Sequence, residues 1–189
     1  MELRHLTSAD SRRVPWKNGR GVTEELLLWP PSTSFERGDF EWRIARAGVA
    51  EDAPFSPFPG FERVLVVISG PGLRLAHGAA APVVVPPLQP HVFSGDDPTR
   101  AGLLGGPVSD LNVLARRGVA RAQVAVLRGA GAELHADHAV LHAVAALRAQ
   151  VGESGVALAA GESLWIREAA AELRVTGGVG VLVQIRAAS

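Results

Sequence analysis

Short apolar runs closed by glycine-containing turns constrain the fold of this chain more than any other feature. Residues 63–69 (RVLVVIS) are mostly β-branched and end at Gly70-Pro71-Gly72, which is typical of a buried strand followed by a turn. The alternating residues 73–75 predict a second strand that returns as a hairpin. Many short strands with glycine turns predict an all-β sandwich or barrel. The same pattern recurs at 123–127, 156–158, 163–167, 172–175 and 179–186.

Two segments are less regular than these runs. Residues 132–150 are rich in alanine, which favours a helix, yet Val140, His142 and Val144 alternate, and we interpret the segment as strand. Residues 79–90 contain four prolines, which cannot donate to a β-ladder. This second segment is therefore expected to be an edge strand or a loop.

Composition excludes several classes of function. The chain has 189 residues, enough for one large domain or two small fused ones, and its 19 basic residues balance 19 acidic ones. It shows no basic run interleaved with aromatic residues, and no apolar stretch approaches the roughly 20 residues that span a bilayer. Cysteine is absent, which excludes disulfides, thiolate catalysis and sulfur-bound metals. We therefore expect a cytoplasmic protein without a signal peptide that binds neither nucleic acid nor membrane.

Lysine occurs once, in Pro15-Trp16-Lys17-Asn18-Gly19, whereas arginine occurs 18 times. Lys17 also adjoins one of only two asparagines, the other being Asn112. A compositional bias of this kind readily turns surface lysine into arginine. A lysine that remains indicates a site where a compact ammonium cannot be replaced by a planar guanidinium. We interpret Lys17 and Asn18 as ligand-binding residues with Trp16 at the rim of their pocket; the alternative is an ordinary loop.

Two arginines are candidates for an interior site. Arg43 lies opposite the aromatic residues of the alternating segment 40–44, so it points into a barrel if the apolar face packs outward. Arg63 opens the next apolar strand. A guanidinium presents a rigid fork of donors that matches a carboxylate. In the alternative interpretation, the arginines are neutralised internally by Glu25, Glu62 or Asp110.

Further candidates lie in the loop 54–61 (PFSPFPGF), which alternating prolines stiffen and hold extended. Phe58 and the neighbouring phenylalanines can form a lid, although a structural cap is the simpler role, and Ser56 offers a hydroxyl. Ser56 lacks the glycine-flanked elbow of acyl nucleophiles, so we do not interpret it as catalytic.

Asp110, Asn112 and Arg116 share the parity of one strand face, which would direct an acceptor, an amide and a guanidinium into the same space. Turn formation is the alternative for Asp110 and Asn112, because these side chains readily bond to their own backbone.

The six histidines do not show the spacing of a metal site built from two histidines one residue apart and a following glutamate. His77 and His91 are separated by the proline-rich stretch and have no partnering glutamate. His135, His138 and His142 would converge as ligands only on a helix. We therefore expect no metal and no cofactor.

Three stretches that carry these motifs, 15–25, 40–63 and 106–118, follow one another in an order and spacing that are quite specific. In them the chain resembles the HutD/Ves family of small bicupin proteins. The resemblance implies an all-β fold of two fused, jelly-roll-like cupin barrels. Residues 1–118 would form the barrel with the motifs and 119–189 a smaller one, with strands that can swap between them. Arg20 and Ala45 stand where the family usually has glycine and serine, which could alter the polar lining of the pocket.

In HutD-like proteins the resemblance also implies a link to histidine utilisation, through binding of a carboxylated intermediate such as formimino- or formylglutamate. We expect a small anionic metabolite as the partner, no catalysis, and a homodimer as an option. One alternative is a metal-free cupin enzyme, a hydrolase or isomerase, with Lys17 or Asp110 as acid or base; another is a dimeric structural scaffold. The expected ligand-binding residues are Trp16, Lys17, Asn18, Thr23, Arg43, Ser56, Phe58, Arg63, Asp110, Asn112 and Arg116.

Overall fold

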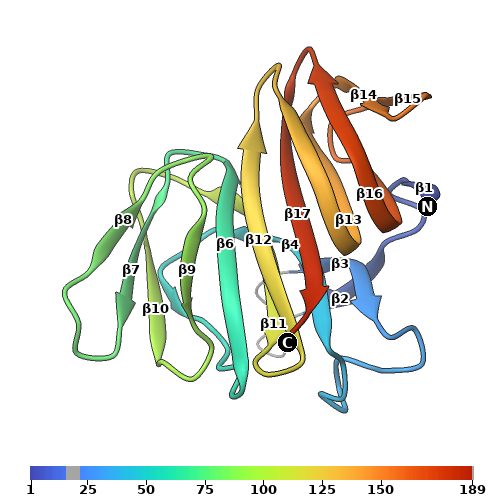
Figure 1. Ribbon diagram of the computed structural model, residues 1–189. Helices are drawn as coiled ribbons and strands as arrows, with labels where there is room; N and C mark the ends of the chain where they lie inside the picture. Colours follow the sequence, from blue (N-terminus) through green and yellow to red (C-terminus); the bar gives the residue numbers. More distant parts are fainter. Residues whose placement is uncertain (16–21, 189) are drawn as a thin grey trace. The chain divides into compact units, whose positions relative to one another are not determined.

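The computed structural model describes residues 1–15 and 22–188, and within these ranges it contains seventeen strands and no helix (Figure 1). The expected all-β class is confirmed. Accordingly, none of the described residues belongs to an apolar helix long enough to cross a membrane. Three of the expected ligand-binding residues, Trp16, Lys17 and Asn18, lie outside the described residues.

Two compact units make up the chain. The motif unit comprises Arg12–Ala120, and the C-terminal unit comprises Met1–Ser11 together with Arg121–Ser189. This division differs from the expected one mainly at the start of the chain, which falls in the C-terminal unit. The reason is that strand β1 (Glu2–Leu6) is hydrogen-bonded to β16 (Ser163–Thr176).

The motif unit consists of two sheets. The six-stranded sheet has the order β2-β3-β4-β11-β6-β9, and the four-stranded sheet has the order β5-β10-β7-β8. The strands of the six-stranded sheet are β2 (Arg12–Pro15), β3 (Val22–Trp29), β4 (Trp42–Val49), β11 (Val108–Arg116), β6 (Phe61–Ser69) and β9 (His91–Ser94). Those of the four-stranded sheet are β5 (Ala53–Pro54), β10 (Thr99–Leu103), β7 (Leu73–His77) and β8 (Val83–Val85).

One apolar core joins these two sheets. Leu65 and Val67 of β6 share a cluster of buried side chains with Leu73 and Leu75 of β7 and Val85 of β8. Side chains from the facing surfaces of two sheets meet in this way when the sheets pack face to face. The face of β6 that carries Leu65 and Val67 is therefore the interior face of the motif unit.

The turn Gly70-Pro71-Gly72 carries the chain from one sheet to the other. Strand β6 pairs with β11 and β9, whereas β7 pairs with β10 and β8, so the expected hairpin between residues 63–69 and 73–75 is wrong. Gly70 has a φ of 95°, and a Cβ atom there would lie 2.4 Å from the carbonyl oxygen of Pro107. Only glycine permits this combination of backbone conformation and close approach.

The C-terminal unit contains one seven-stranded sheet of order β12-β17-β13-β16-β14-β15, in which β1 also pairs with β16. Its core includes Leu134, Leu141, Ile166, Leu173 and Leu182. Besides β1 and β16, its strands are β12 (Ala120–Leu127), β13 (Gly131–Ala145), β14 (Leu147–Val151), β15 (Ser154–Leu158) and β17 (Val179–Ala187).

The alanine-rich segment 132–150 forms strands β13 and β14, as the alternation predicted. Pairing of β13 with both β16 and β17 overrides the helical propensity of alanine. The runs 163–167 and 172–175 belong to one strand, β16, so the turn expected between them is wrong. Glu168, within this strand, has a φ of 51°. The proline-rich segment 79–90 contains the edge strand β8, as expected.

Candidate functional site

The strand register of the six-stranded sheet places both candidate arginines on its interior face. Leu114 of β11 lies opposite Arg43 of β4 and opposite Arg63 of β6. Residues opposite each other in a ladder project to the same side of the sheet. Because Arg63 and Leu65 are two residues apart on β6, the arginines project toward the interior.

Other predicted residues project from the same face. Asn112 of β11 lies opposite Leu65 of β6, and Asp110 shares its parity. Thr23 of β3 lies opposite Ala47, which in turn lies opposite Asp110. Five residues that the sequence analysis selected, on four strands, therefore face one interior space: Thr23, Arg43, Arg63, Asp110 and Asn112.

Arg43 is neutralised within this space. Its Nε donates a hydrogen bond of 2.7 Å to Oε2 of Glu25, and less than a tenth of either side chain is exposed. Its guanidinium carbon lies 4.2 Å from the centroid of the Phe35 ring. Burial lowers the pKa of Arg43, and the hydrogen bond and charge of Glu25 act in the opposite direction. The internal pairing that the sequence analysis left open is therefore the arrangement of Arg43.

Arg63 is buried without such a partner. Its Nη2 donates to Oδ1 of Asn112 at 3.1 Å and its Nη1 to the carbonyl oxygen of Ser56 at 3.2 Å, but among the described residues Nε has no hydrogen-bond partner. No carboxylate of the described residues forms an ion pair with Arg63. Its guanidinium carbon lies 4.8 to 5.3 Å from the ring centroids of Phe93, Phe58 and Phe55.

Asp110 is connected to Arg63 through Asn112. Asn112 donates from Nδ2 to Oδ1 of Asp110, while Oδ2 has no hydrogen-bond partner among the described residues. Burial raises the pKa of Asp110 to about 7, against the charge of Arg63 and the hydrogen bond from Asn112. Burial also lowers the pKa of Arg63 to about 10, against the charge of Asp110. Arg63 therefore remains a cation at neutral pH, and the carboxyl of Asp110 changes its protonation near neutral pH.

Three predicted residues take other roles or lie at the margin. Arg116 donates through Nε to the carbonyl oxygen of Phe40 at 2.9 Å and through Nη2 to that of Gly38, so its guanidinium fastens this loop. Ser56 is exposed and offers Arg63 its carbonyl rather than its hydroxyl. Phe58 contributes its ring to the surroundings of Arg63.

The motif unit also contains a histidine pair that was not predicted from the sequence. His77 of β7 and His91 of β9 face each other with 3.0 Å between their Nε2 atoms, and both are half-buried. His91 lies opposite Leu65 and so belongs to the interior face. The proline-rich stretch between them suggested separation, but it loops out through the edge strand β8 and returns. No group of three or more potential ligand side chains suited to a metal ion is found within residues 1–15 and 22–188.

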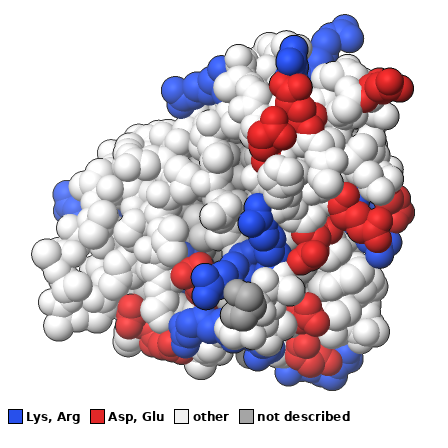
Figure 2. Space-filling view, in the orientation of Figure 1, with Lys and Arg blue, Asp and Glu red and all other residues white. Residues whose placement is uncertain are grey.

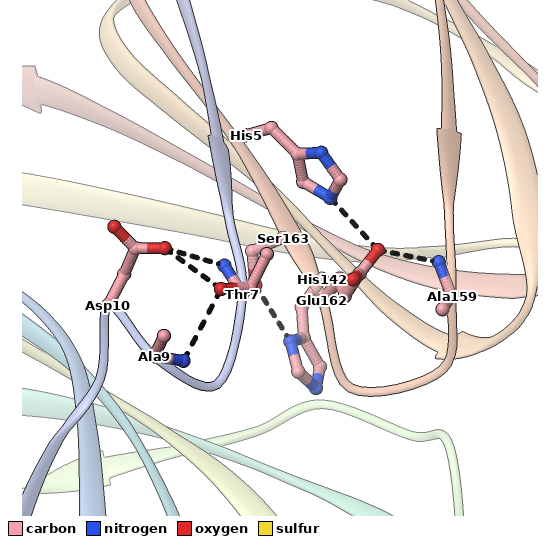
Figure 3. A network of polar contacts seen from close by, with 8 residues as sticks. All are labelled: His5, Thr7, Ala9, Asp10, His142, Ala159, Glu162 and Ser163. Atoms are coloured by element: carbon pink, nitrogen blue, oxygen red, sulfur yellow. Dashed lines mark hydrogen bonds and ion pairs between the residues drawn. The ribbon is translucent and has the colours of Figure 1, made fainter.

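A second polar network lies in the C-terminal unit (Figure 3). Nε2 of His5 lies 2.9 Å from Oε2 of Glu162, which also accepts a hydrogen bond from the backbone amide of Ala159. Nδ1 of His142 lies 2.9 Å from Oγ of Ser163, and each of these two residues is only 1% exposed. Solvent does not reach the His142–Ser163 pair, which links β13 to β16, whereas the partly exposed His5–Glu162 pair links β1 to the residue that precedes β16.

Charged side chains are mixed on the face drawn in Figure 2, where basic and acidic groups lie next to one another beside broad uncharged areas. A surface of this kind has none of the one-sided charge that steers large polyanions. On the face drawn, no patch of a single charge competes with the interior face of the motif unit as a candidate site.

Solved structures identify the class of protein to which this fold belongs. A conserved protein of unknown function from Pseudomonas aeruginosa PAO1 matches with a TM-score of 0.88 and 29% identity, over 98% of this chain and all of that one. HutD from Pseudomonas fluorescens SBW25, in a formate condition, matches over the full length of both chains with a TM-score of 0.85 and 27% identity. Oxalate decarboxylase from Bacillus subtilis shares the fold alone, with a TM-score of 0.64 and 10% identity over 96% of this chain and 76% of that one. The chain is a bicupin.

Within that class the family is also defined. The HutD family model matches residues 8–183, and the chain belongs to the HutD family. Protein Ves from Citrobacter koseri is 38% identical over 121 residues, which are 62% of this chain and 61% of Ves. An uncharacterised 21.2 kDa protein in the hutC 3′ region of Pseudomonas putida is 36% identical over 114 residues, covering 60% of this chain and 58% of that protein. The matched segment thus spans about three fifths of these relatives.

Proposed function

We propose that this protein binds a small carboxylated metabolite of the formimino- or formylglutamate type in the interior of the motif unit and thereby modulates histidine utilisation. The family relationship supports the metabolic setting, because the resemblance to HutD-like proteins implies a link to histidine utilisation. The chemistry is supported by the residues around Arg63.

The observation that carries the proposal is a buried cation with an unused donor. Arg63 is 6% exposed, and among the described residues it has neither a carboxylate partner nor an acceptor for Nε. Removing a charge from water without a counter-charge is unfavourable by several kcal/mol. A ligand carboxylate at Nε would supply that counter-charge, and each charge-assisted hydrogen bond contributes about 1.5–3 kcal/mol.

The two arginines differ in whether the protein itself supplies a counter-charge. Glu25 already supplies its counter-charge, so Arg43 gains little from an incoming anion. Its ring contact with Phe35 and its ion pair instead hold the β3 and β4 side of the site in place. We therefore assign recognition of the carboxylate to Arg63 and a supporting role to Arg43.

Isothermal titration calorimetry and thermal unfolding with N-formylglutamate and formiminoglutamate test the proposal. A ligand that binds only the folded state stabilises it by about 2.7 kcal/mol at one hundred times its Kd. Arg63→Gln should abolish this stabilisation, and Arg74→Gln, at an exposed arginine of β7, should retain it. Absence of any change with millimolar ligand would exclude the proposal and favour a scaffold.

Asp110 supports a second candidate, a metal-free enzyme that acts on a similar acid. Burial raises the pKa of this carboxyl to about 7, the range suited to a general acid or base, and its Oδ2 has no partner among the described residues. Incubation of the protein with each ligand, followed by NMR, distinguishes the two functions. An unchanged spectrum for a compound that calorimetry shows to bind supports binding alone, and formation of a product that Asp110→Asn abolishes supports catalysis.

A further inference from the structure

The two histidines of the motif unit form a hydrogen bond between their rings. The rings are nearly parallel, with an interplanar angle of 19° and 5.2 Å between their centroids, and the Nε2 atoms lie 3.0 Å apart. A contact of this length between two imidazole nitrogens requires a proton on one of them and a lone pair on the other.

The surrounding hydrogen bonds assign the two tautomers. The hydroxyl of Thr99 donates to the carbonyl oxygen of Asp97 at 3.0 Å, so at 3.0 Å from Nδ1 of His77 it acts as an acceptor. His77 therefore carries its proton on Nδ1 and accepts at Nε2, and His91 donates from Nε2. One proton is shared between the two facing nitrogens.

This pair lies beside the proposed carboxylate site. The Phe93 ring is 4.8 Å from the guanidinium carbon of Arg63 on one side and 4.7 Å from the His77 ring centroid on the other. His91 and Phe93 are two residues apart on β9 and share the interior face. One aromatic ring thus separates the cation from the pair, and both histidines retain partial exposure to solvent.

We propose that His77 and His91 form the second anion-binding end of this site, so that its ligand is a dicarboxylate with one carboxylate on Arg63 and the other between the two imidazoles. This inference rests on the proposed function. The second carboxylate would replace one N–H···N hydrogen bond by two N–H···O hydrogen bonds. Because Thr99 holds the Nδ1 proton of His77 in place, a proton on both Nε2 atoms makes His77 a cation, and binding takes up one proton for each ligand bound.

The charges around the pair agree with such an exchange. Burial lowers the pKa of His77, as does the charge of Arg63, while Asp97 acts in the opposite direction. Burial and His77 lower the pKa of His91. The free pair is therefore neutral at neutral pH. Among the residues that the structure describes, Asp110 is the other group facing this space whose protonation can change there, and its contribution has to be measured separately.

The test compares N-formylglutamate with N-formylglutamine, in which an amide replaces the second carboxylate. Calorimetry at pH 7.5 in phosphate and in Tris, whose ionisation enthalpies differ, measures the protons exchanged by the unsubstituted protein. We expect about one proton taken up with N-formylglutamate and none with N-formylglutamine, and a Kd for the dicarboxylate that rises about tenfold per pH unit. Proton uptake should persist in Asp110→Asn.

Two histidine variants test whether these side chains bind the second carboxylate. His91→Gln and His77→Gln should bring the Kd for N-formylglutamate to that for N-formylglutamine and remove the proton uptake, whereas His135→Gln, at an exposed histidine of the C-terminal unit, should change neither. Equal binding of both compounds without proton uptake would overturn the role of the histidines and leave the proposed function standing. If neither compound binds, the proposed function fails, and the inference fails with it.

Discussion

Arg63 and Asp110 are bridged by a single amide: Asn112 accepts a hydrogen bond from Nη2 of Arg63 and donates one to Oδ1 of Asp110. Each of the two ionisable groups also has one atom without a hydrogen-bond partner among the described residues, Nε and Oδ2 respectively. The bridge orients both groups toward the interior without joining them as an ion pair. The stability of the motif unit therefore depends on these three side chains, and the proposed binding of an anion depends on Arg63.

Removal of the amide should destabilise the protein. In Asn112→Ala, the buried Nη2 of Arg63 and Oδ1 of Asp110 lose a partner each, and an unsatisfied buried group costs about 1–3 kcal/mol. We expect the free energy of unfolding in urea to fall by about 2 kcal/mol or more. Gln123→Ala removes an exposed amide from β12 and should change it by less than about 0.5 kcal/mol. Equal effects of the two substitutions would contradict the bridge.

Asp110 makes stability depend on pH. Burial raises its pKa from 3.8 to about 7, so between these values the folded protein holds a proton that the unfolded chain has released. The free energy of unfolding should therefore decrease as the pH rises through this window, by up to about 1.4 kcal/mol per pH unit, and level off above pH 7.

Asp110→Asn isolates this contribution because it keeps an acceptor for Asn112 and does not ionise. In urea unfolding at pH 4.5, 5.5, 6.5 and 8, we expect the variant to gain on the parent protein as the pH rises to 7. Glu133→Gln, at an exposed carboxylate of β13, should run parallel to the parent. Parallel curves for Asp110→Asn as well would show that the carboxyl ionises normally.

The buried ion pair of Arg43 and Glu25 should be sensitive to removal of one partner. Glu25→Gln leaves the guanidinium without a counter-charge, which costs about 3–5 kcal/mol at a buried site. Combining it with Arg43→Met should recover much of this loss. The exposed pair Arg37–Asp39, with a distance of 2.8 Å, is the control, and its coupling energy in a double-mutant cycle should be below about 1 kcal/mol. A similarly small coupling for the buried pair would refute this ranking.

Gly70 should not tolerate a side chain. In Gly70→Ala, the new Cβ would meet the carbonyl oxygen of Pro107 in a backbone conformation that alanine disfavours, so we expect a loss of more than about 1 kcal/mol in unfolding free energy. Gly78 also has a positive φ, of 54°, but a Cβ there has no neighbour within 4 Å. Gly78→Ala thus measures backbone strain alone, and the larger loss should belong to Gly70→Ala.

Alternation in the sequence predicted much of the interior face, because parity along a strand is a local property. It indicated that Arg43 projects away from Trp42, and that Asp110 and Asn112 project together. Alternation did not indicate whether Arg43 would bind a ligand or pair with an acidic residue of the protein. That choice depends on the register of β3 against β4, which shifts between Glu25 and Leu27 and brings Glu25 to the guanidinium.

Features that depend on contacts between distant strands were not predictable in this way. The sequence around Gly70 predicts a hairpin. In the structure this turn instead connects strands of two different sheets, and it passes close to Pro107, the residue before β11. The pairing of His77 with His91 was missed for the same reason. These residues meet because β7 and β9 belong to different sheets that share a core. Periodicity in the sequence does not indicate which sheets pack against each other.

The pairing of β1 with β16 has a consequence for synthesis of the chain on the ribosome. Glu2–Leu6 leaves the exit tunnel well before Ser163–Thr176 has been translated, so its backbone amides and carbonyls must stay hydrated, or be shielded by a chaperone, until β16 has emerged. Among the strands of the C-terminal unit, the earliest to be made is therefore one of the last to be completed.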